Sequence, residues 1–454
     1  MRTLLIIKHP YSQGLQHSRH HQQVNTLRHK ITRNLSGYTY SQLITLGSQI
    51  LVVPFFLSAW GVQKYGEWLV LTSIPTFLAM LELGVAEASA TRASLASGSR
   101  DIVTIRKTID TALAFSIITS LIVAILGTII ATTVPWTTYL KLTTIDLQSS
   151  KHIFIYMSLY LAGNFLAGPI SAWLKSMDLT ATSAFSMANR RAAEMVVIAI
   201  SLLGGANPTI LAACLMITSF ATTTIYYFIA LHHSTIGAMS LSNADRKELY
   251  VVFWPAISFM ALPLSQVATL QGGVLILNSL AGGATVAAFS MSRTMVRLLM
   301  QIGIVFNNAM RPEVSRLLGQ NLEAKARKIV KKGSLTAAGI MLVGLCGVAL
   351  FGSKILAIWS DGKVILSETF LVILALHAVI NVLWYVPSTL LFAQNKHGNI
   401  SWFYMAFSTI SLFLWWLFSS KISALNGAAL MMLLPELFMT GIVLTGLYQS
   451  QRKA

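Results

Sequence analysis

Long apolar stretches dominate this sequence and constrain what it can fold into. A helix needs about 20 mostly apolar residues to cross the roughly 30 Å hydrocarbon core of a membrane. Twelve stretches meet this need, provided that the short fifth one extends back past Arg190 and Arg191. They are residues 37–60, 67–86, 109–134, 152–174, 192–206, 208–231, 251–277, 284–307, 334–352, 365–386, 399–419 and 424–447. The sequence therefore predicts an all-α polytopic membrane protein with twelve transmembrane helices.

The composition excludes several other classes of protein. Hydrophobic residues make up 55% of the chain and charged residues 11%, whereas an ordinary soluble domain carries about 25% charged residues. This is too little polar surface to cover a folded globule of 454 residues. A water-soluble enzyme, a disordered chain and a DNA-binding domain are excluded. We expect membrane lipid as a partner, and no nucleic acid.

The net charge is nevertheless +18, and the distribution of the cations explains it. With both termini cytoplasmic, 25 of the 33 Lys and Arg residues fall in cytoplasmic segments, six in outer loops and two within the eighth span. Lys and Arg accumulate in cytoplasmic loops of membrane proteins. This distribution predicts a multi-pass protein with both termini in the cytoplasm.

The spans divide into two sets of six. We predict a six-helix bundle over 37–231, a cytoplasmic linker at 232–250, a second bundle over 251–448 and a cytoplasmic tail at 449–454. An even number of spans gives both bundles the same orientation, as in a parallel repeat. A sequence echo at an offset of 221 residues agrees with this division. In it, Ser58, Gly61, Tyr65, Gly66 and Trp68 are matched by Ser279, Gly282, Val286, Ala287 and Phe289.

Residues 1–36 are polar, basic and rich in histidine. Half of the ten histidines lie here, without the repeated spacing of a metal site. A disordered cytoplasmic extension, or a start codon assigned too early, explains the segment better than metal binding does. Its basic residues are suited to rest on anionic lipid headgroups.

No pattern of catalytic or metal-ligating residues stands out. Cys214 and Cys346 lie in separate spans and indicate neither a disulfide framework nor a metal site. The chain has no phosphate-cradling Gly-Lys-Ser/Thr loop, so it carries no ATPase motor of that kind. We expect no cofactor and no metal, and energy from an ion gradient, the substrate gradient or a partner.

The spans that open the two halves are polar for membrane helices. The first carries Ser41, Thr45 and Gln49, and the seventh carries Gln266 together with two prolines and a Gly pair. Such residues either line an aqueous cavity beside a moving helix or make ordinary hydrogen bonds between helices. The prolines and the Gly pair favour a moving helix for the seventh span. Both interpretations stay open for the first.

Two regions of the chain resemble a known family. Gly61-Val-Gln-Lys-Tyr-Gly-Glu-Trp68 with Leu81-Glu-Leu-Gly-Val85, and Phe289-Ser-Met-Ser-Arg-Thr-Met-Val-Arg297 with Pro312-Glu-Val-Ser-Arg316, resemble bacterial polysaccharide-repeat (O-antigen type) flippases. These belong to the multidrug/oligosaccharidyl-lipid/polysaccharide flippase superfamily, and the likeness in span layout covers residues 34–450.

The resemblance implies a fold and a substrate. The implied fold has two bundles around a central cavity that opens alternately to each side of the bacterial cytoplasmic (inner) membrane. The implied substrate is an undecaprenyl-diphosphate-linked oligosaccharide, moved from the inner to the outer leaflet for surface polysaccharide assembly. Polysaccharide polymerase machinery is a further expected partner.

Arg293 and Arg297 stand near the middle of the eighth span, where each costs about 2.5–3.5 kcal/mol on the insertion scale. Their spacing of four places both on one helical face, with Gln301 nearly in line. A guanidinium stays charged and grips phosphate oxygens bidentately. We therefore predict that this face binds the diphosphate. The alternative is a structural ion pair with Glu436, although two arginines exceed one buried acid.

Other polar residues lie in the middle of other spans, namely Asn164, His377, Asn381 and Glu436. Glu436 is the first candidate for binding a coupling proton or sodium ion. His377 titrates near neutral pH and is a second candidate, although a neutral histidine bonded to a neighbouring helix is the more ordinary role. Asn164 and Asn381 are predicted to line the cavity.

Two alternative functions stay open. An ion-coupled multidrug or metabolite antiporter of the same superfamily would need acidic residues in the cavity to bind organic cations. A membrane polysaccharide polymerase or ligase would need a large outer loop with clustered charges, and the outer loops here are short and nearly neutral.

Overall fold

The computed structural model describes residues 11–79, 82, 84–98, 101–177, 179–319, 322–393 and 398–452, and over these it is helical with no strand. Its helices are α1 (Tyr11–Leu78), α2 (Val85–Gly98), α3 (Ile102–Thr133), α4 (Trp136–Tyr139), α5 (Leu147–Ser176), α6 (Thr180–Leu203), α7 (Pro208–His232), α8 (Arg246–Gly319), α9 (Glu323–Trp359), α10 (Glu368–Tyr385), α11 (Thr389–Ala393), α12 (Gly398–Leu417) and α13 (Ala424–Arg452).

The predicted fold class is confirmed. Within the described ranges, nine helices are long and apolar enough to cross a membrane. Two of these, α1 and α8, each contain one non-helical residue at which the chain turns back, so each crosses the membrane twice. The more polar α6 supplies the remaining pass, so the predicted twelve transmembrane helices are all present.

The breaks in α1 and α8 occur at glycines. Gly61 has φ 73° and ψ 175°, and Gly282 has φ 76° and ψ 175°. Residues with a Cβ rarely adopt such a positive φ, so glycine allows the chain to turn back here. Both glycines belong to the sequence echo. The two halves therefore make the same turn at equivalent positions, as expected for a parallel repeat.

Capping side chains set where several other helices begin. In each case a side-chain oxygen accepts a hydrogen bond from a backbone amide in the first turn, which would otherwise lack a partner. These caps are Asp101 for α3, Asp146 for α5, Asn207 for α7 and Ser367 for α10. The hydroxyl and amide of Ser149 hold the pKa of Asp146 below its ordinary value.

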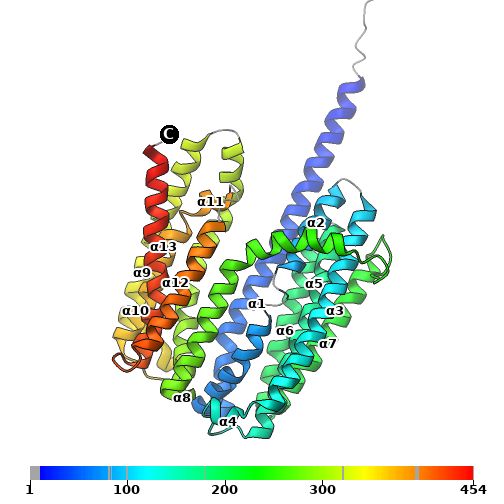
Figure 1. Cartoon of the computed structure of the whole chain (residues 1–454). Coiled ribbons are helices and arrows are strands. Elements are labelled where there is room, and N and C mark those ends of the chain that lie inside the picture. The colour runs from blue at the N-terminus through cyan, green and yellow to red at the C-terminus, as the bar shows by residue number, and fades with distance from the viewer. Residues whose placement is uncertain are drawn as a thin grey trace, which may run out of the picture.

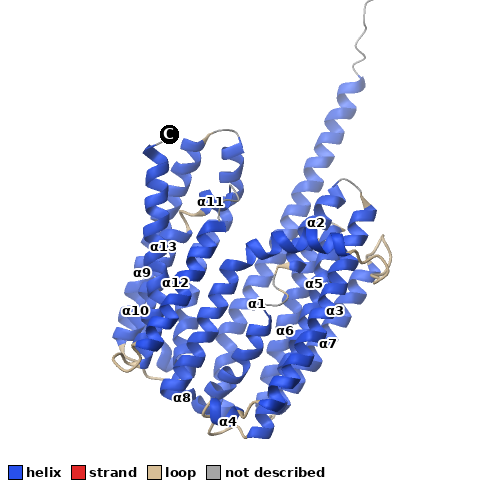
Figure 2. Cartoon of the chain, in the orientation of Figure 1, coloured by secondary structure: helices blue, strands red, loops and turns tan. Residues whose placement is uncertain are grey.

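The helices form two bundles, α1–α7 and α8–α13, which diverge at the end where α13 terminates and converge at the other end (Figure 1). The connections between helices are short and lie at the two ends of the bundles (Figure 2). Helices α1 and α8 make the most extensive contact between the halves. We call the converging end the closed end and the diverging end the open end.

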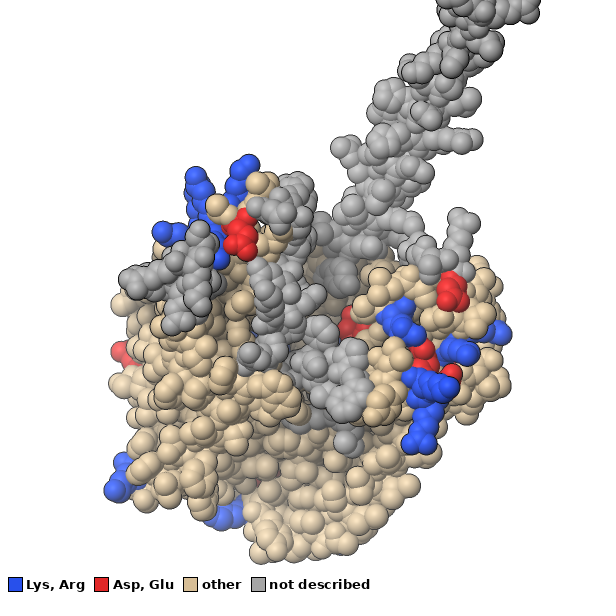
Figure 3. Space-filling view, turned by 45° about the horizontal axis from the view of Figure 1, so that its top comes forward, with Lys and Arg blue, Asp and Glu red and all other residues tan. Residues whose placement is uncertain are grey.

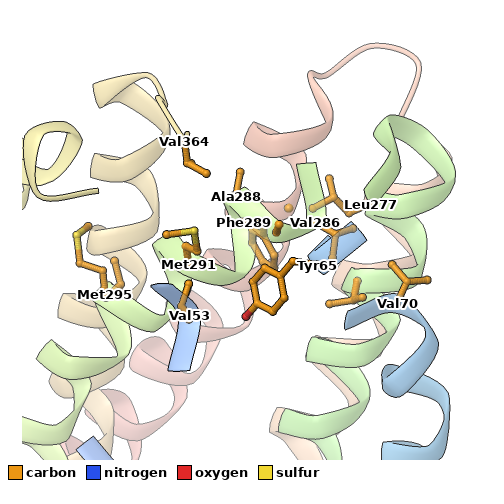
Figure 4. Packing of buried hydrophobic residues seen from close by; sticks show 14 of the residues in the cluster. Val53, Tyr65, Val70, Leu277, Val286, Ala288, Phe289, Met291, Met295 and Val364 are labelled. Carbon is orange, nitrogen blue, oxygen red and sulfur yellow. The ribbon is translucent and has the colours of Figure 1, made fainter. Parts of the chain in front are cut away.

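The closed end is filled by side chains from both halves. A single cluster of buried apolar residues includes Phe56, Tyr65 and Trp68 from α1 together with Val286 and Phe289 from α8. The ring of Tyr65 lies beside that of Phe289 (Figure 4). The halves thus share one core at this end.

The start of α8 is fastened to the N-terminal half. Asp110 accepts hydrogen bonds from the amide of Ser240 at 2.9 Å and from the side chain of Asn243 at 2.8 Å. Glu248, in the first turn of α8, accepts hydrogen bonds from Arg92 of α2 and Thr108 of α3. The linker predicted at 232–250 is therefore a packed segment, and α8 leaves it to cross to the other half.

Helix α1 begins at Tyr11, inside the N-terminal extension. That residues 1–36 form a disordered cytoplasmic extension stays a prediction. The segment between Pro10 and Pro54 contains no proline, so a helix nucleated in the membrane can propagate back through it at little further cost. Residues 1–10 and the side chains of 11–35, with the histidine tract, lie outside the described residues.

Lys and Arg side chains gather on the open end of both halves (Figure 3). Only a few are visible on the flank toward the closed end in that view. This segregation agrees with the charge distribution of the sequence, and the cytoplasmic placement of the open end stays a prediction.

Candidate functional site

A cavity of about 280 Å³ lies in the C-terminal half, between α8, α10, α12 and α13. Its polar lining comes from Gln266, Thr269, Arg293, Arg297, His377 and Tyr404. The segment of α8 after Gly282 supplies both arginines, and the segment before it supplies Gln266 and Thr269. The turn at Gly282 thus brings two stretches of α8 to one cavity.

Among the residues that the structure describes, Arg293 and Arg297 have no acidic partner. Arg297 is exposed and Arg293 is half-buried, and the Nε of Arg293 has no hydrogen-bond partner among the described residues. Within the same described part of the chain, neither forms an ion pair with a carboxylate. The alternative of a structural ion pair with Glu436 is therefore not what the structure shows.

A third arginine approaches this pair from the other half. Arg191 of α6 is exposed, and its Nη1 donates to the hydroxyl of Thr45 at 2.5 Å. It is close enough to Arg297, in the other half, for the two positive charges to repel each other. The sequence predicted that the fifth span extends past Arg191 but gave Arg191 no role at the site. The structure puts it within a membrane helix, on the face turned to the other half.

Glu436 is fully buried, with 0% of its surface exposed. Its carboxylate accepts hydrogen bonds from Asn381 Nδ2 at 3.0 Å, Trp384 Nε1 at 2.5 Å and the Tyr404 hydroxyl at 3.0 Å. Asn381, predicted to line the cavity, is therefore engaged with this carboxylate. Neither Trp384 nor Tyr404 was foreseen, although both are polar-tipped aromatic residues in apolar spans.

His377 connects the Glu436 cluster to the arginine cavity. Its Nδ1 lies 3.0 Å from the carbonyl oxygen of Met432 and 3.7 Å from Glu436 Oε1. Because a carbonyl oxygen can only accept, Nδ1 must carry the proton of that hydrogen bond. His377 and Tyr404 both line the cavity. His377 and Tyr404 therefore contact Glu436 and also line the cavity that holds Arg293 and Arg297.

The N-terminal half has a buried polar cluster of its own around Arg190. This side chain is 7% exposed. It donates to Asn164, to Ser219 at 2.7 Å and to Thr223 at 3.1 Å. Its Nε lies 3.6 Å from Glu194. Asn164, predicted to line the cavity, is held inside this cluster, and Glu194 is the acidic residue of the cluster.

The remaining predicted cavity residues fall in different environments. Gln266 is exposed and lines the cavity. The Thr45 hydroxyl donates a hydrogen bond to the Ser41 carbonyl oxygen at 2.7 Å and accepts one from Arg191. Gln49 Oε1 is buried without a hydrogen-bond partner among the described residues. Gln301 is half-buried, one turn beyond Arg297, and is not one of the cavity-lining residues.

A further acid that the sequence analysis missed fixes the closed end. Glu67, 1% exposed, accepts from the amides of Thr143, Thr144 and Ile145 at 2.9, 3.0 and 3.1 Å. These amides belong to the loop between α4 and α5. Gln63 also donates to Glu67, at 3.0 Å. The signal in the sequence was an acid in the first turns of a helix that follows a glycine turn.

Comparison with known proteins identifies the fold. Residues 40–200 match the family model described as MatE. No curated protein matches the sequence. An inward-facing structure of a multidrug resistance MATE family transporter of the MOP superfamily matches 93% of this chain and 97% of its own, with 15% identity and a TM-score of 0.68. The chain has the MATE fold.

Two further MATE-fold structures sharpen the comparison. An outward-facing multidrug resistance MATE transporter matches with 16% identity, a TM-score of 0.57 and coverage of 93% and 95%. A MOP superfamily transporter from Pyrococcus furiosus, whose binding pocket is described as having reverse polarity that suggests a different function, matches with 13% identity, a TM-score of 0.53 and the same coverage. The TM-score is higher for the inward-facing structure than for the outward-facing one. These matches show the fold and do not single out the O-antigen flippase branch.

Proposed function

We propose that this MATE-fold protein is a secondary transporter that carries an anionic substrate across a membrane by alternating access. The cluster of Arg191, Arg293 and Arg297 carries this proposal. Arg293 and Arg297 line the cavity and Arg191 lies in the other half beside Thr45, whereas the buried acid Glu436 is already occupied by three hydrogen-bond donors. A phosphate or diphosphate supplies the missing negative charge and the planar oxygen pairs that guanidinium groups bind best.

The specific substrate that we propose is a lipid-linked oligosaccharide diphosphate, in agreement with the flippase resemblance of the sequence. The cavity of about 280 Å³ is at the small end of ligand pockets, so it suits the diphosphate, with the sugars and lipid extending from it. The same proposal places the protein in a bacterial cytoplasmic membrane with its open end inside.

An ion-coupled multidrug or metabolite antiporter is the second candidate, and the structural neighbours favour it over the flippase. Two of the three structures described above are multidrug resistance transporters. The charge of the cavity points the other way, because organic cations are repelled by uncompensated arginines. The reverse-polarity pocket of the Pyrococcus furiosus transporter is a precedent for a MATE fold that serves another substrate.

The decisive experiment compares substrates of opposite charge. The full-length protein is reconstituted in lipid vesicles, and translocation of a lipid-linked oligosaccharide diphosphate is measured beside efflux of ethidium. We expect transport of the diphosphate, and a loss of at least about tenfold in the double variant Arg293→Gln/Arg297→Gln. The matched control is Lys354→Gln/Lys421→Gln, which removes two exposed cations far from the cavity. Ethidium transport without diphosphate transport would establish the second candidate instead.

A further inference from the structure

A second cavity, of about 360 Å³, lies on the flank of the C-terminal half between α9, α10 and α13. These helices form the side of this half that faces away from the N-terminal half (Figure 1). Large apolar side chains at its rim are exposed, among them Leu335 at 65%, Leu383 at 37% and Leu444 at 48%. On a membrane-spanning bundle, this exposed apolar face lies against lipid. We call this cavity the flank groove.

Polarity changes along the flank groove in one direction. Arg327, Lys331 and Ser334 line it near the start of α9, and Leu335 and Ala338 continue the same helical face toward the interior of the membrane. At 1.5 Å per residue, the distance from Arg327 to Ala338 is roughly 16 Å, close to the hydrocarbon depth of one leaflet. The flank groove therefore has a cationic end at the membrane surface and an apolar end at depth.

The cationic end keeps a net positive charge. Arg327 Nη2 lies 3.5 Å from Glu323, one turn away. Lys331 is exposed, and the same two turns also carry Lys328 and Lys332. The Ser334 hydroxyl is buried without a hydrogen-bond partner among the described residues. An unsatisfied buried hydroxyl costs free energy, and an oxygen-rich anion in the groove would satisfy it.

We propose that the flank groove binds one anionic phospholipid of the adjoining leaflet. Its phosphate lies between Arg327 and Lys331 and accepts a hydrogen bond from Ser334. One acyl chain follows Leu335, Leu383 and Leu444. The charge, the depth and the direction of the polarity gradient all match such a lipid. This site is separate from the arginine cavity, so it does not depend on the proposed transport function.

The test uses the full-length protein in phosphatidylcholine nanodiscs that contain a phosphatidylglycerol with a photoreactive acyl chain. After illumination, labelled peptides are mapped, and the same is done with photoreactive phosphatidylcholine. We expect the anionic lipid to label residues 335–338, 383–390 and 444 severalfold more than the zwitterionic one. In Arg327→Gln/Lys331→Gln this labelling falls by about fivefold or more. Ser334→Ala lowers it less, and Lys354→Gln/Lys421→Gln, at the other end of the bundle, leaves it unchanged.

Three results would overturn the proposal. Equal labelling by both lipids would show that the groove is ordinary lipid-facing surface. Labelling that survives in Arg327→Gln/Lys331→Gln would remove the cationic end from the site. Full competition by inorganic phosphate would make it a site for the free anion, since a bound phospholipid is also held by its acyl chain.

Discussion

Gln63 Oε1 accepts a hydrogen bond at 3.1 Å from the backbone amide of Ala284, a residue 221 positions further along the chain. This separation equals the offset of the sequence echo, so the two are equivalent positions in the two halves. Each follows its turning glycine by two residues. Equivalent residues of a repeat meet only near the axis that relates the repeats. The closed end is therefore built around that axis, where α1 and α8 cross.

The first prediction concerns Gly66 in the same crossing. A Cβ at Gly66 would lie 1.7 Å from the carbonyl oxygen of Gly283, and the backbone atoms there cannot yield without separating the helices. We expect Gly66→Ala to disfavour this conformation by about 1–3 kcal/mol. Ser58 and Ser279 are both exposed near the two turns. The distance between spin labels at these positions, measured by pulsed electron paramagnetic resonance, should then be longer than in the wild type.

Gly47→Ala is the matched control for Gly66→Ala. Gly47 lies in the same helix, and a Cβ there would meet no atom within 4 Å. In Gly47→Ala, the distance distribution between the spin labels at Ser58 and Ser279 should equal that of the wild type. If Gly66→Ala also leaves the distribution unchanged, the Gly66–Gly283 contact does not control the closed end.

The sequence was sufficient for the helices and for the turns in α1 and α8. Apolar stretches must become helices in a membrane because backbone groups have no other partners there. The turns were foreseeable because a positive φ favours glycine. Polar helices lack this signature. That is why α2 was not predicted.

The candidate site was only partly predictable. The depth of Arg293 and Arg297 could be inferred from the centre of an apolar span. The roles of Arg190 and Arg191 could not, because consecutive helical residues point about 100° apart. Which of the two faces the other half depends on how α6 packs on its neighbours. The donors to Glu436 come from helices distant in sequence, so no local pattern reveals them.

The second prediction concerns Glu436 as a coupling site. Glu436→Gln keeps the size of the side chain but replaces one accepting oxygen with a donor that faces the Trp384 or Tyr404 donors. We expect transport to lose its dependence on pH or on sodium, because the ion-binding charge is gone. Transport rates across a pH series, with and without sodium, measure this. Glu368→Gln, at an exposed acid at the start of α10, is the control. A profile identical to the wild type would exclude Glu436 as the coupling residue.

The third prediction concerns Glu248, which ties α8 to the N-terminal half. Burial raises the pKa of Glu248, but the hydrogen bonds from Arg92 and Thr108 outweigh it and leave the pKa below 4.5. A carboxyl group whose pKa falls on folding stabilises the folded state above its unfolded pKa. That contribution is lost as the pH falls through the folded pKa.

We therefore expect Glu248→Gln to lower the free energy of unfolding by about 1 kcal/mol at neutral pH. The difference from the wild type should shrink as the pH falls from 4.5 through the lower pKa of the folded state, because Glu248 then becomes neutral, as Gln already is. Thermal unfolding measured over a pH series tests this. Glu323→Gln, at a half-exposed pair with Arg327, should have a smaller effect. A difference that is constant with pH would show that the charge of Glu248 does not stabilise the junction.

The last prediction separates the adjacent residues Arg190 and Arg191. Arg190 is buried among Asn164, Ser219 and Thr223 and donates hydrogen bonds to them. Arg190→Gln removes hydrogen bonds from these buried polar groups and leaves Glu194 unpaired. We expect a loss of about 3 kcal/mol of stability. Arg191 is exposed toward the other half, and Arg191→Gln should change stability by no more than about 0.5 kcal/mol while weakening diphosphate binding about tenfold. Melting temperature and binding measured on both variants check this. If Arg190→Gln is as stable as the wild type, or if Arg191→Gln binds the diphosphate normally, the two residues do not divide structure and substrate binding between them.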